Sequence, residues 1–96
     1  MFMPILRLPA IMNYYTDRQS EFVVSGSTAI EAVRAAAEKY PALKFHVLDG
    51  QNNLRSHINL FVNNVHVREL NGLETPVGEK DVVRILPAVA GGETIA

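Results

Sequence analysis

The residue types that most often do chemistry in proteins form no recognisable catalytic group in this sequence. His46, His57 and His66 do not have the spacing of metal ligands on one helix face, and no acidic residue accompanies them in a known arrangement. The carboxylates are scattered, so no two of them stand out as an acid–base pair. Ser27 and Thr28 lack the strand–turn–helix setting of a nucleophile. We therefore expect a protein that is not an enzyme and holds no metal or cofactor of its own.

The other stretch with chemical meaning follows Pro87 and reads Ala88, Val89, Ala90, Gly91, Gly92. These five residues have small side chains or none, so a partner protein can approach their backbone closely. Such a segment fits a narrow channel. A Gly-Gly pair near a terminus is also typical of a frayed chain end, and both interpretations stay open on the residues alone. The pair is not a phosphate-binding loop, because the Lys and Ser or Thr of that motif do not follow it.

The segments that would position this stretch begin with a predicted hairpin. Within Met3–Ala10, Leu6 and Leu8 alternate with Ile5 and Arg7, which is typical of a strand. A polar, turn-prone stretch follows, and the short run 21–24 then has the composition of a second strand. The two runs predict a hairpin with a long loop.

A helix is predicted after this hairpin. Thr28 and Glu31 have the spacing of a capping box, and apolar residues then recur at helical spacing until Pro41. The expected buried face carries Ala29, Ile30, Val33, Ala36 and Ala37, and the expected wet face carries Glu31, Arg34, Glu38 and Lys39. The next stretch, 42–57, fits either one short helical turn or an irregular packed strand.

The C-terminal half predicts further strands and a tight turn. Ile58, Leu60 and Val62 alternate with outward-facing residues, and the pair Asn63-Asn64 tolerates the positive φ of a hairpin turn. A turn-rich crossing with room for a short 3₁₀ turn leads to the last strand, 81–86. Pro87 is expected to end that strand, because proline cannot donate to a sheet ladder.

This order of elements predicts an α+β fold, with a mixed sheet of about four to five strands and one main helix packed on one face. The β-grasp is the natural candidate, and in it the final strand lies beside the first. Residues 1–87 would form this domain, and residues 88–96 a flexible tail. Alternation places Phe61, Arg84 and Leu86 on the face away from the helix, where we expect a docking patch for a partner.

Composition narrows the class of protein. The 96 residues are enough for one domain, with 48% hydrophobic and 20% charged residues and a net charge of −1. No cysteine is present, which excludes disulfides and thiolate chemistry within these residues. The apolar N-terminal run is interrupted by Pro4, Arg7 and Pro9, so it predicts neither a signal peptide nor a membrane span. We expect a cytoplasmic protein that binds neither nucleic acid nor membranes.

Three segments resemble the ubiquitin-like sulfur-carrier proteins: Ile85–Gly92, Phe61–Asn64 and Gly72–Thr75. The similarity runs from Leu6 to Gly92. That family includes the thiamine-biosynthesis carrier, the small subunit of molybdopterin synthase and a carrier of cysteine biosynthesis. The Pro-Ala-Val-Ala spacer and the segment Leu8–Ile11 look closest to the cysteine branch. The resemblance implies a β-grasp fold, in agreement with the pattern of elements, and sulfur carried as a thiocarboxylate on Gly92.

The sequence departs from the usual family pattern because Glu93-Thr94-Ile95-Ala96 follows the double glycine. An amide at Gly92 cannot be adenylated. The resemblance therefore implies that a zinc metalloprotease first cleaves between Gly92 and Glu93. A ubiquitin-activating-like adenylyltransferase would then use ATP to activate Gly92, and a cysteine-synthase-like enzyme would accept the sulfur. ATP and zinc would belong to these partners, and Ala88 to Gly92 would enter their active sites.

Other interpretations stay open. The extension is alternatively a neutral addition or a cloning remnant. The chain is alternatively a covalent protein modifier in which Gly92 ends on a lysine amine, or a molybdopterin synthase small subunit. A plain β-grasp interaction domain with an inert tail is the last alternative. It predicts that deleting residues 91–96 leaves function unchanged.

Overall fold

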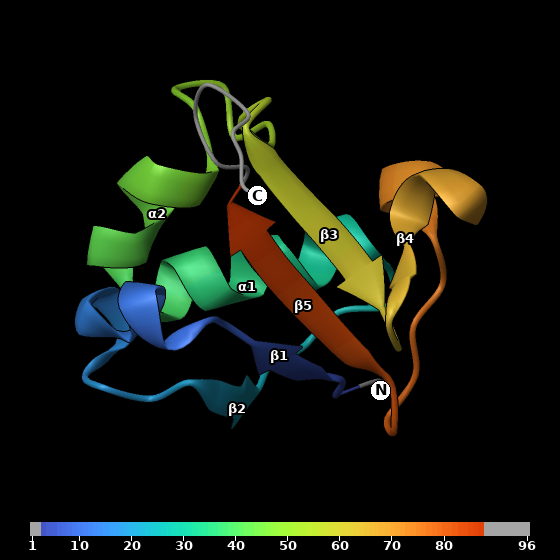
Figure 1. Ribbon diagram of the computed structural model, residues 1–96, viewed down its shortest axis with the longest axis horizontal. Helices are drawn as coiled ribbons and strands as arrows, with labels where there is room; N and C mark the ends of the chain where they lie inside the picture. Colours follow the sequence, from blue (N-terminus) through green and yellow to red (C-terminus); the bar gives the residue numbers. More distant parts are fainter. Residues whose placement is uncertain (1–2, 88–96) are drawn as a thin grey trace.

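The computed structural model describes residues 3–87, and within them a five-stranded sheet is covered on one face by helices. The sheet order is β2-β1-β5-β3-β4; β1 and β5 run parallel and the other neighbours antiparallel, as the predicted β-grasp requires (Figure 1). In chain order the elements are β1 (Ile5–Arg7), η1 (Ala10–Thr16), β2 (Glu21–Val23), α1 (Ala29–Lys39), α2 (Pro41–Val47), β3 (Ile58–Val62), β4 (Val65–His66), η2 (Val67–Glu69), η3 (Gly72–Glu74) and β5 (Val82–Pro87), where η marks a 3₁₀ helix.

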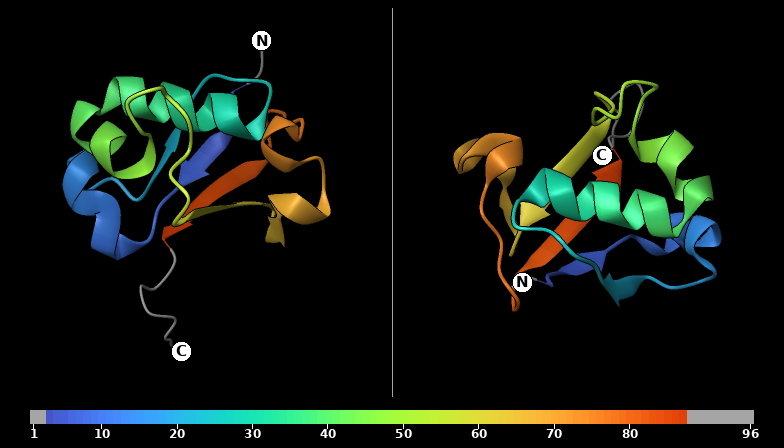
Figure 2. Two further views of the ribbon diagram at one scale, coloured as in Figure 1. Left: turned by 90° about the horizontal axis from the view of Figure 1, so that it is seen from above. Right: turned by 180° about the vertical axis from the view of Figure 1, so that it is seen from behind.

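The core lies between the sheet and α1 (Figure 2). Val83 and Ile85 of the central strand β5 are fully buried, and Val83 is paired with Leu6 on β1 and with Val62 on β3. The alternation in the sequence therefore predicts the register correctly. The apolar face of α1 completes the core with Ala29, Ile30, Val33, Ala36 and Ala37, all buried.

The predicted cap of α1 is present. Thr28 is the N-cap, and its hydroxyl oxygen accepts a hydrogen bond from the Glu31 amide at 3.3 Å. The Glu31 carboxylate reaches back to accept from the amide and the hydroxyl of Ser27, at 2.8 and 3.0 Å. These bonds satisfy donors that the first turn of a helix leaves unpaired.

Two stretches of the structure differ from the prediction or were left open by it. The polar segment before β2, expected to be a loop, contains η1, in which Met12 joins the core and Thr16 is also buried. The ambiguous stretch after Pro41 is a true helix, α2, with Leu43 and Val47 buried.

Strand ends also differ slightly from expectation. The short strand β4 is followed directly by η2, which begins at Val67, and the last strand runs from Val82 to Pro87 instead of over the predicted 81–86. Pro87 is included because it is paired with Ile58 at the end of the ladder, where a missing N–H matters least. The predicted tail, residues 88–96, lies outside the described residues.

Candidate functional site

The described chain ends on the most firmly held strand of the sheet. β5 lies between β1 and β3 and pairs with both, and its inward side chains are fully buried. Pro87, its last residue, is therefore attached to the middle of a packed sheet. A segment that continues from this point starts from a rigid base.

The face of the sheet turned away from α1, which we call the outer face, carries the predicted docking residues. Arg84 on β5 lies opposite Phe61 on β3, and Leu86 lies opposite Asn59. Phe61 and Leu86 are thus diagonal neighbours on one face, within reach of a shared partner side chain. Strand alternation alone was sufficient to group Phe61, Arg84 and Leu86.

This outer face is more polar than the predicted apolar patch. Phe61, Arg84 and Leu86 are each half-buried. The Phe61 ring has its edge against His66, with 5.1 Å between the centroids. His66 is fixed in turn: its Nδ1 accepts from the Arg68 amide, and its Nε2 lies 3.1 Å from Asn59 Oδ1. These three residues present one aromatic ring and one aliphatic side chain around a guanidinium group.

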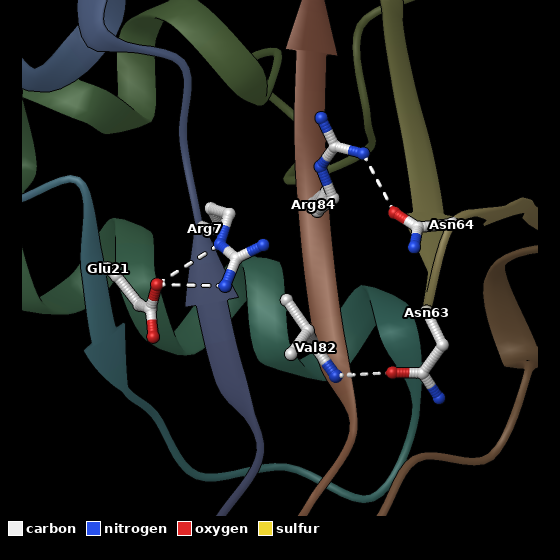
Figure 3. A network of polar contacts seen from close by, with 6 residues as sticks. All are labelled: Arg7, Glu21, Asn63, Asn64, Val82 and Arg84. Carbon is white, nitrogen blue, oxygen red and sulfur yellow. Dashed lines mark hydrogen bonds and ion pairs between the residues drawn. The ribbon is translucent and has the colours of Figure 1, made fainter.

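Two arginines stand side by side on this face. Arg7 on β1 and Arg84 on β5 are register partners (Figure 3). Arg7 is neutralised by Glu21, with nitrogen–oxygen distances of 3.0 and 3.1 Å. Arg84 instead donates to the amide oxygen of Asn64 at 2.9 Å. Within residues 3–87 the Arg7–Glu21 pair is the sole ion pair, so Arg84 presents a positive charge with no carboxylate on it.

The turn between β3 and β4 holds this arrangement in place. Asn63 and Asn64 have φ values of 52° and 75°, as the predicted tight turn requires. The Asn63 side chain accepts from the Val82 amide at 3.0 Å and donates to Asp81 at 2.8 Å. Asn63 thus fixes the turn against the start of β5, and Asn64 positions the Arg84 guanidinium (Figure 3).

Two carboxylates of the described residues, Glu31 and Asp49, accept hydrogen bonds that hold local structure. No group of three or more His, Cys, Asp or Glu residues capable of holding a metal occurs in the part of the chain that the structure describes. Hydrogen bonds from Ser27 lower the pKa of Glu31, and those from the Asn53 and Gln51 amides lower the pKa of Asp49. These two carboxylates cap a helix and a turn.

Besides an open depression of about 360 Å³ between β2 and α1, two hollows were not anticipated from the sequence. The larger, about 560 Å³, lies on the wet side of α1 and is lined by residues such as Arg34, Glu38 and Lys44, far from the outer face. The smaller, about 190 Å³, lies beside the end of β5 and is lined by Ile11, Met12, Tyr15, His46, His57, Ile58 and Pro87. One signal in the sequence points toward the second hollow, since Ile11 and Tyr15 are one helical turn apart after Pro9.

The residues predicted to carry the chemistry itself lie outside the described residues. These are Ala88, Val89, Ala90, Gly91 and Gly92, together with the expected cleavage point between Gly92 and Glu93. Among the described helices, none has the length and apolar character needed to cross a membrane.

Comparison with known proteins covers nearly the whole chain. The model of the ThiS family matches residues 6–92. The sulfur carrier protein CysO of Mycobacterium tuberculosis is 32% identical over 87 residues, which are 88% of this chain and 94% of that protein. The solution structure of small archaeal modifier protein 1 from Methanosarcina acetivorans superposes with a TM-score of 0.83 at 30% identity, covering 96% and 100% of the two chains. A crystal structure of a BexX/CysO complex from Amycolatopsis orientalis gives a TM-score of 0.77 at 31% identity, covering 92% and 98%.

Proposed function

Because this chain belongs to the ThiS family of ubiquitin-like sulfur carriers, we propose that it carries sulfur as a thiocarboxylate on Gly92 and delivers it to a biosynthetic enzyme that makes cysteine or a related metabolite. The observation that carries this proposal is the position of Gly92, five residues beyond the rigid end of β5 and within the segment that the family model matches. The chain itself is a cosubstrate and not a catalyst.

The chemistry of this role is performed by partner enzymes. A carboxylate is a poor electrophile, so an adenylyltransferase that uses ATP first joins the Gly92 carboxylate to AMP and releases pyrophosphate. A sulfur nucleophile then attacks the acyl carbon and AMP leaves, which places sulfur on Gly92. The small residues from Ala88 to Gly92 allow this carbon to be brought into a narrow active site.

Hydrolysis after Gly92 must precede activation, because at least four residues follow it in this sequence. A zinc metalloprotease that cleaves the Gly92–Glu93 bond would supply the free carboxylate. A bound zinc ion suits this step because it lowers the pKa of its water and polarises the scissile carbonyl. In this proposal the 96-residue chain is the precursor of the active carrier.

The outer face is the docking surface that we assign to the adenylyltransferase. Arg84 offers a charge that pairs with no carboxylate among residues 3–87, and Phe61 and Leu86 flank it with apolar area. A partner carboxylate can accept two hydrogen bonds from one guanidinium, which fixes orientation as well as adding affinity. Aromatic and arginine residues are also the types that dominate binding energy at protein interfaces.

A second function shares the same activated intermediate. The protein from Methanosarcina acetivorans is named a modifier protein, and its fold superposes closely on this chain. An adenylated Gly92 can transfer to a lysine amine instead of to sulfur. The covalent modifier is therefore the alternative that we retain beside the sulfur carrier.

Mass spectrometry of the chain purified from its native cells distinguishes the sulfur carrier from the covalent modifier. If the chain is a sulfur carrier, the purified protein should end at Gly92 and be attached to no other protein. Its intact mass should show that one oxygen has been replaced by sulfur. The modifier predicts Gly92 joined through an isopeptide bond to lysines of other proteins. A chain that carries neither sulfur nor a protein attachment under sulfur starvation would contradict both.

A further inference from the structure

The smaller hollow lies where the described chain ends, and we call it the tail-root hollow. Its walls are formed by η1, by the end of α2, and by His57 with the paired residues Ile58 and Pro87. Its volume of about 190 Å³ exceeds that of several water molecules, since one water occupies about 30 Å³ in the liquid. It is therefore large enough to receive a side chain from another molecule.

Contacts within the protein hold the walls of this hollow in place before any partner binds. The rings of Tyr15 and His46 stack with centroids 3.8 Å apart and an angle of 22°, which ties η1 to α2. η1 is anchored underneath by Met12, which is 5% exposed, and by Thr16, whose hydroxyl donates to the Gln19 carbonyl at 2.6 Å. Binding to a preformed surface loses little conformational entropy.

The rim of the hollow is exposed and carries one large apolar side chain, Ile11, beside two histidines. Ile11 is 81% exposed even though it stands on an anchored helix, and it lines the hollow beside Pro87. No residue that lines the hollow is a carboxylate or an ammonium group. Four of the seven lining residues are aliphatic, and the other three, Tyr15, His46 and His57, carry rings with a polar group. The aliphatic part, with Ile11 at its rim, favours an apolar contact.

The length of the tail decides which partner meets this surface. Five residues separate Pro87 from the reacting carbon of Gly92, and an extended chain spans at most about 18 Å over that distance. The molecule measures 39 × 31 × 25 Å, so the reach of the tail is shorter than the smallest dimension of the body. An enzyme that buries the Gly92 carbonyl must bring the mouth of its channel close to Pro87, and hence to the tail-root hollow.

We propose that the tail-root hollow is a second docking surface, which receives an apolar side chain from the channel mouth of the adenylyltransferase. This inference rests on the proposed function, since it assumes that the enzyme draws in residues 88–92. The outer face and the hollow adjoin at the end of β5, where Leu86 belongs to the first surface and Pro87 to the second. Contacts on both would hold the carrier on either side of its tail.

The test mixes the chain ending at Gly92 with the adenylyltransferase and ATP. The rate of exchange between ATP and labelled pyrophosphate is the readout. Ile11→Asp should raise the KM for the carrier about tenfold and leave kcat nearly unchanged, because a charge would be placed in an apolar contact away from the reacting atoms. Ile11→Leu should behave like the wild type. Tyr14→Asp is the matched control, because Tyr14 is 74% exposed on the same helix but does not line the hollow.

The outcomes distinguish this inference from the proposed function. Equal KM values for Ile11→Asp, Tyr14→Asp and the wild type, with all three folded by circular dichroism, would overturn the hollow as a docking surface and leave the sulfur carrier intact. A raised KM for Ile11→Asp that coincides with loss of a dimer in sedimentation would also overturn it, since the occupant would then be a second copy. If the wild-type chain ending at Gly92 undergoes no exchange, the proposed function itself fails.

Discussion

Val83 is the residue on which the packing of the sheet depends most directly. It is fully buried and paired with Leu6 on one side and Val62 on the other. We expect Val83→Ala to lower the free energy of unfolding by about 1–3 kcal/mol, through lost burial and a residual cavity. Chemical denaturation measures this. The control is Val65→Ala at a site 40% exposed on the edge strand, where the change should stay within about 0.5 kcal/mol.

Phe61 is the residue that best tests docking on the outer face. Its ring is half-buried beside His66 and lies opposite Arg84. Phe61→Asp should leave the domain folded and weaken binding of the adenylyltransferase by about tenfold or more, because the new charge is desolvated in the contact. Titration calorimetry gives the affinity. Leu73→Asp, on η3 and away from the outer face, is the control, and an equal loss for both variants would remove Phe61 from the interface.

At the scale of elements, we expect the hydrogen bonds at the start of α1 to make the free energy of unfolding depend on pH. The pKa of Glu31 is lowered from its ordinary value of 4.5, because its carboxylate accepts hydrogen bonds from Ser27. A lowered folded-state pKa means that the stabilisation is present above pH 4.5 and is lost as the pH falls through the folded value. Glu31→Gln should lower the Tm at pH 7 and flatten its decline below pH 4.5. A Tm–pH curve parallel to the wild type would contradict this assignment.

The turn between β3 and β4 connects the hairpin to the start of β5 and to Arg84 on the outer face. Asn63 adopts φ 52° and its side chain bonds to both Val82 and Asp81. Asn63→Ala should destabilise the fold by about 1–3 kcal/mol, because alanine is strained at positive φ and leaves the Val82 amide without this acceptor. Asn64→Gly keeps the backbone conformation and removes only the contact to Arg84. Thermal melts should therefore separate the two variants clearly.

The elements that the sequence predicts well are those with a strong local pattern. Thr28 and Glu31 identify the start of α1, and the alternation around Val83 identifies the faces of β5. η1 and α2 were harder because their stability comes from tertiary contacts. The Tyr15–His46 stack joins residues that are distant in the sequence, and no periodic pattern announces it. The tail-root hollow depends on that stack, so the spacing of Ile11 and Tyr15 in the sequence points toward it but does not locate it.

At the scale of the whole molecule, the fold places the last described strand at the centre of the sheet. The sheet buries β5 between two neighbours, while two surfaces of different chemistry adjoin at Pro87. In the proposed function the body provides recognition and the residues beyond it provide the reactive carbon. All the chemistry of the proposed function occurs on Gly92, which must have a free carboxylate before activation.

The measurement that tests this claim most directly is the intact mass of two chains after incubation with the adenylyltransferase, ATP and a sulfur donor. The chain ending at Gly92 should gain the mass of one oxygen-to-sulfur exchange, and the 96-residue chain should not change, because its Gly92 carbonyl is held in an amide with Glu93. Gly92→Ala in the shorter chain should react poorly, since a Cβ crowds a channel shaped for glycine. Thiocarboxylation of the full chain with Glu93–Ala96 still attached would contradict the account.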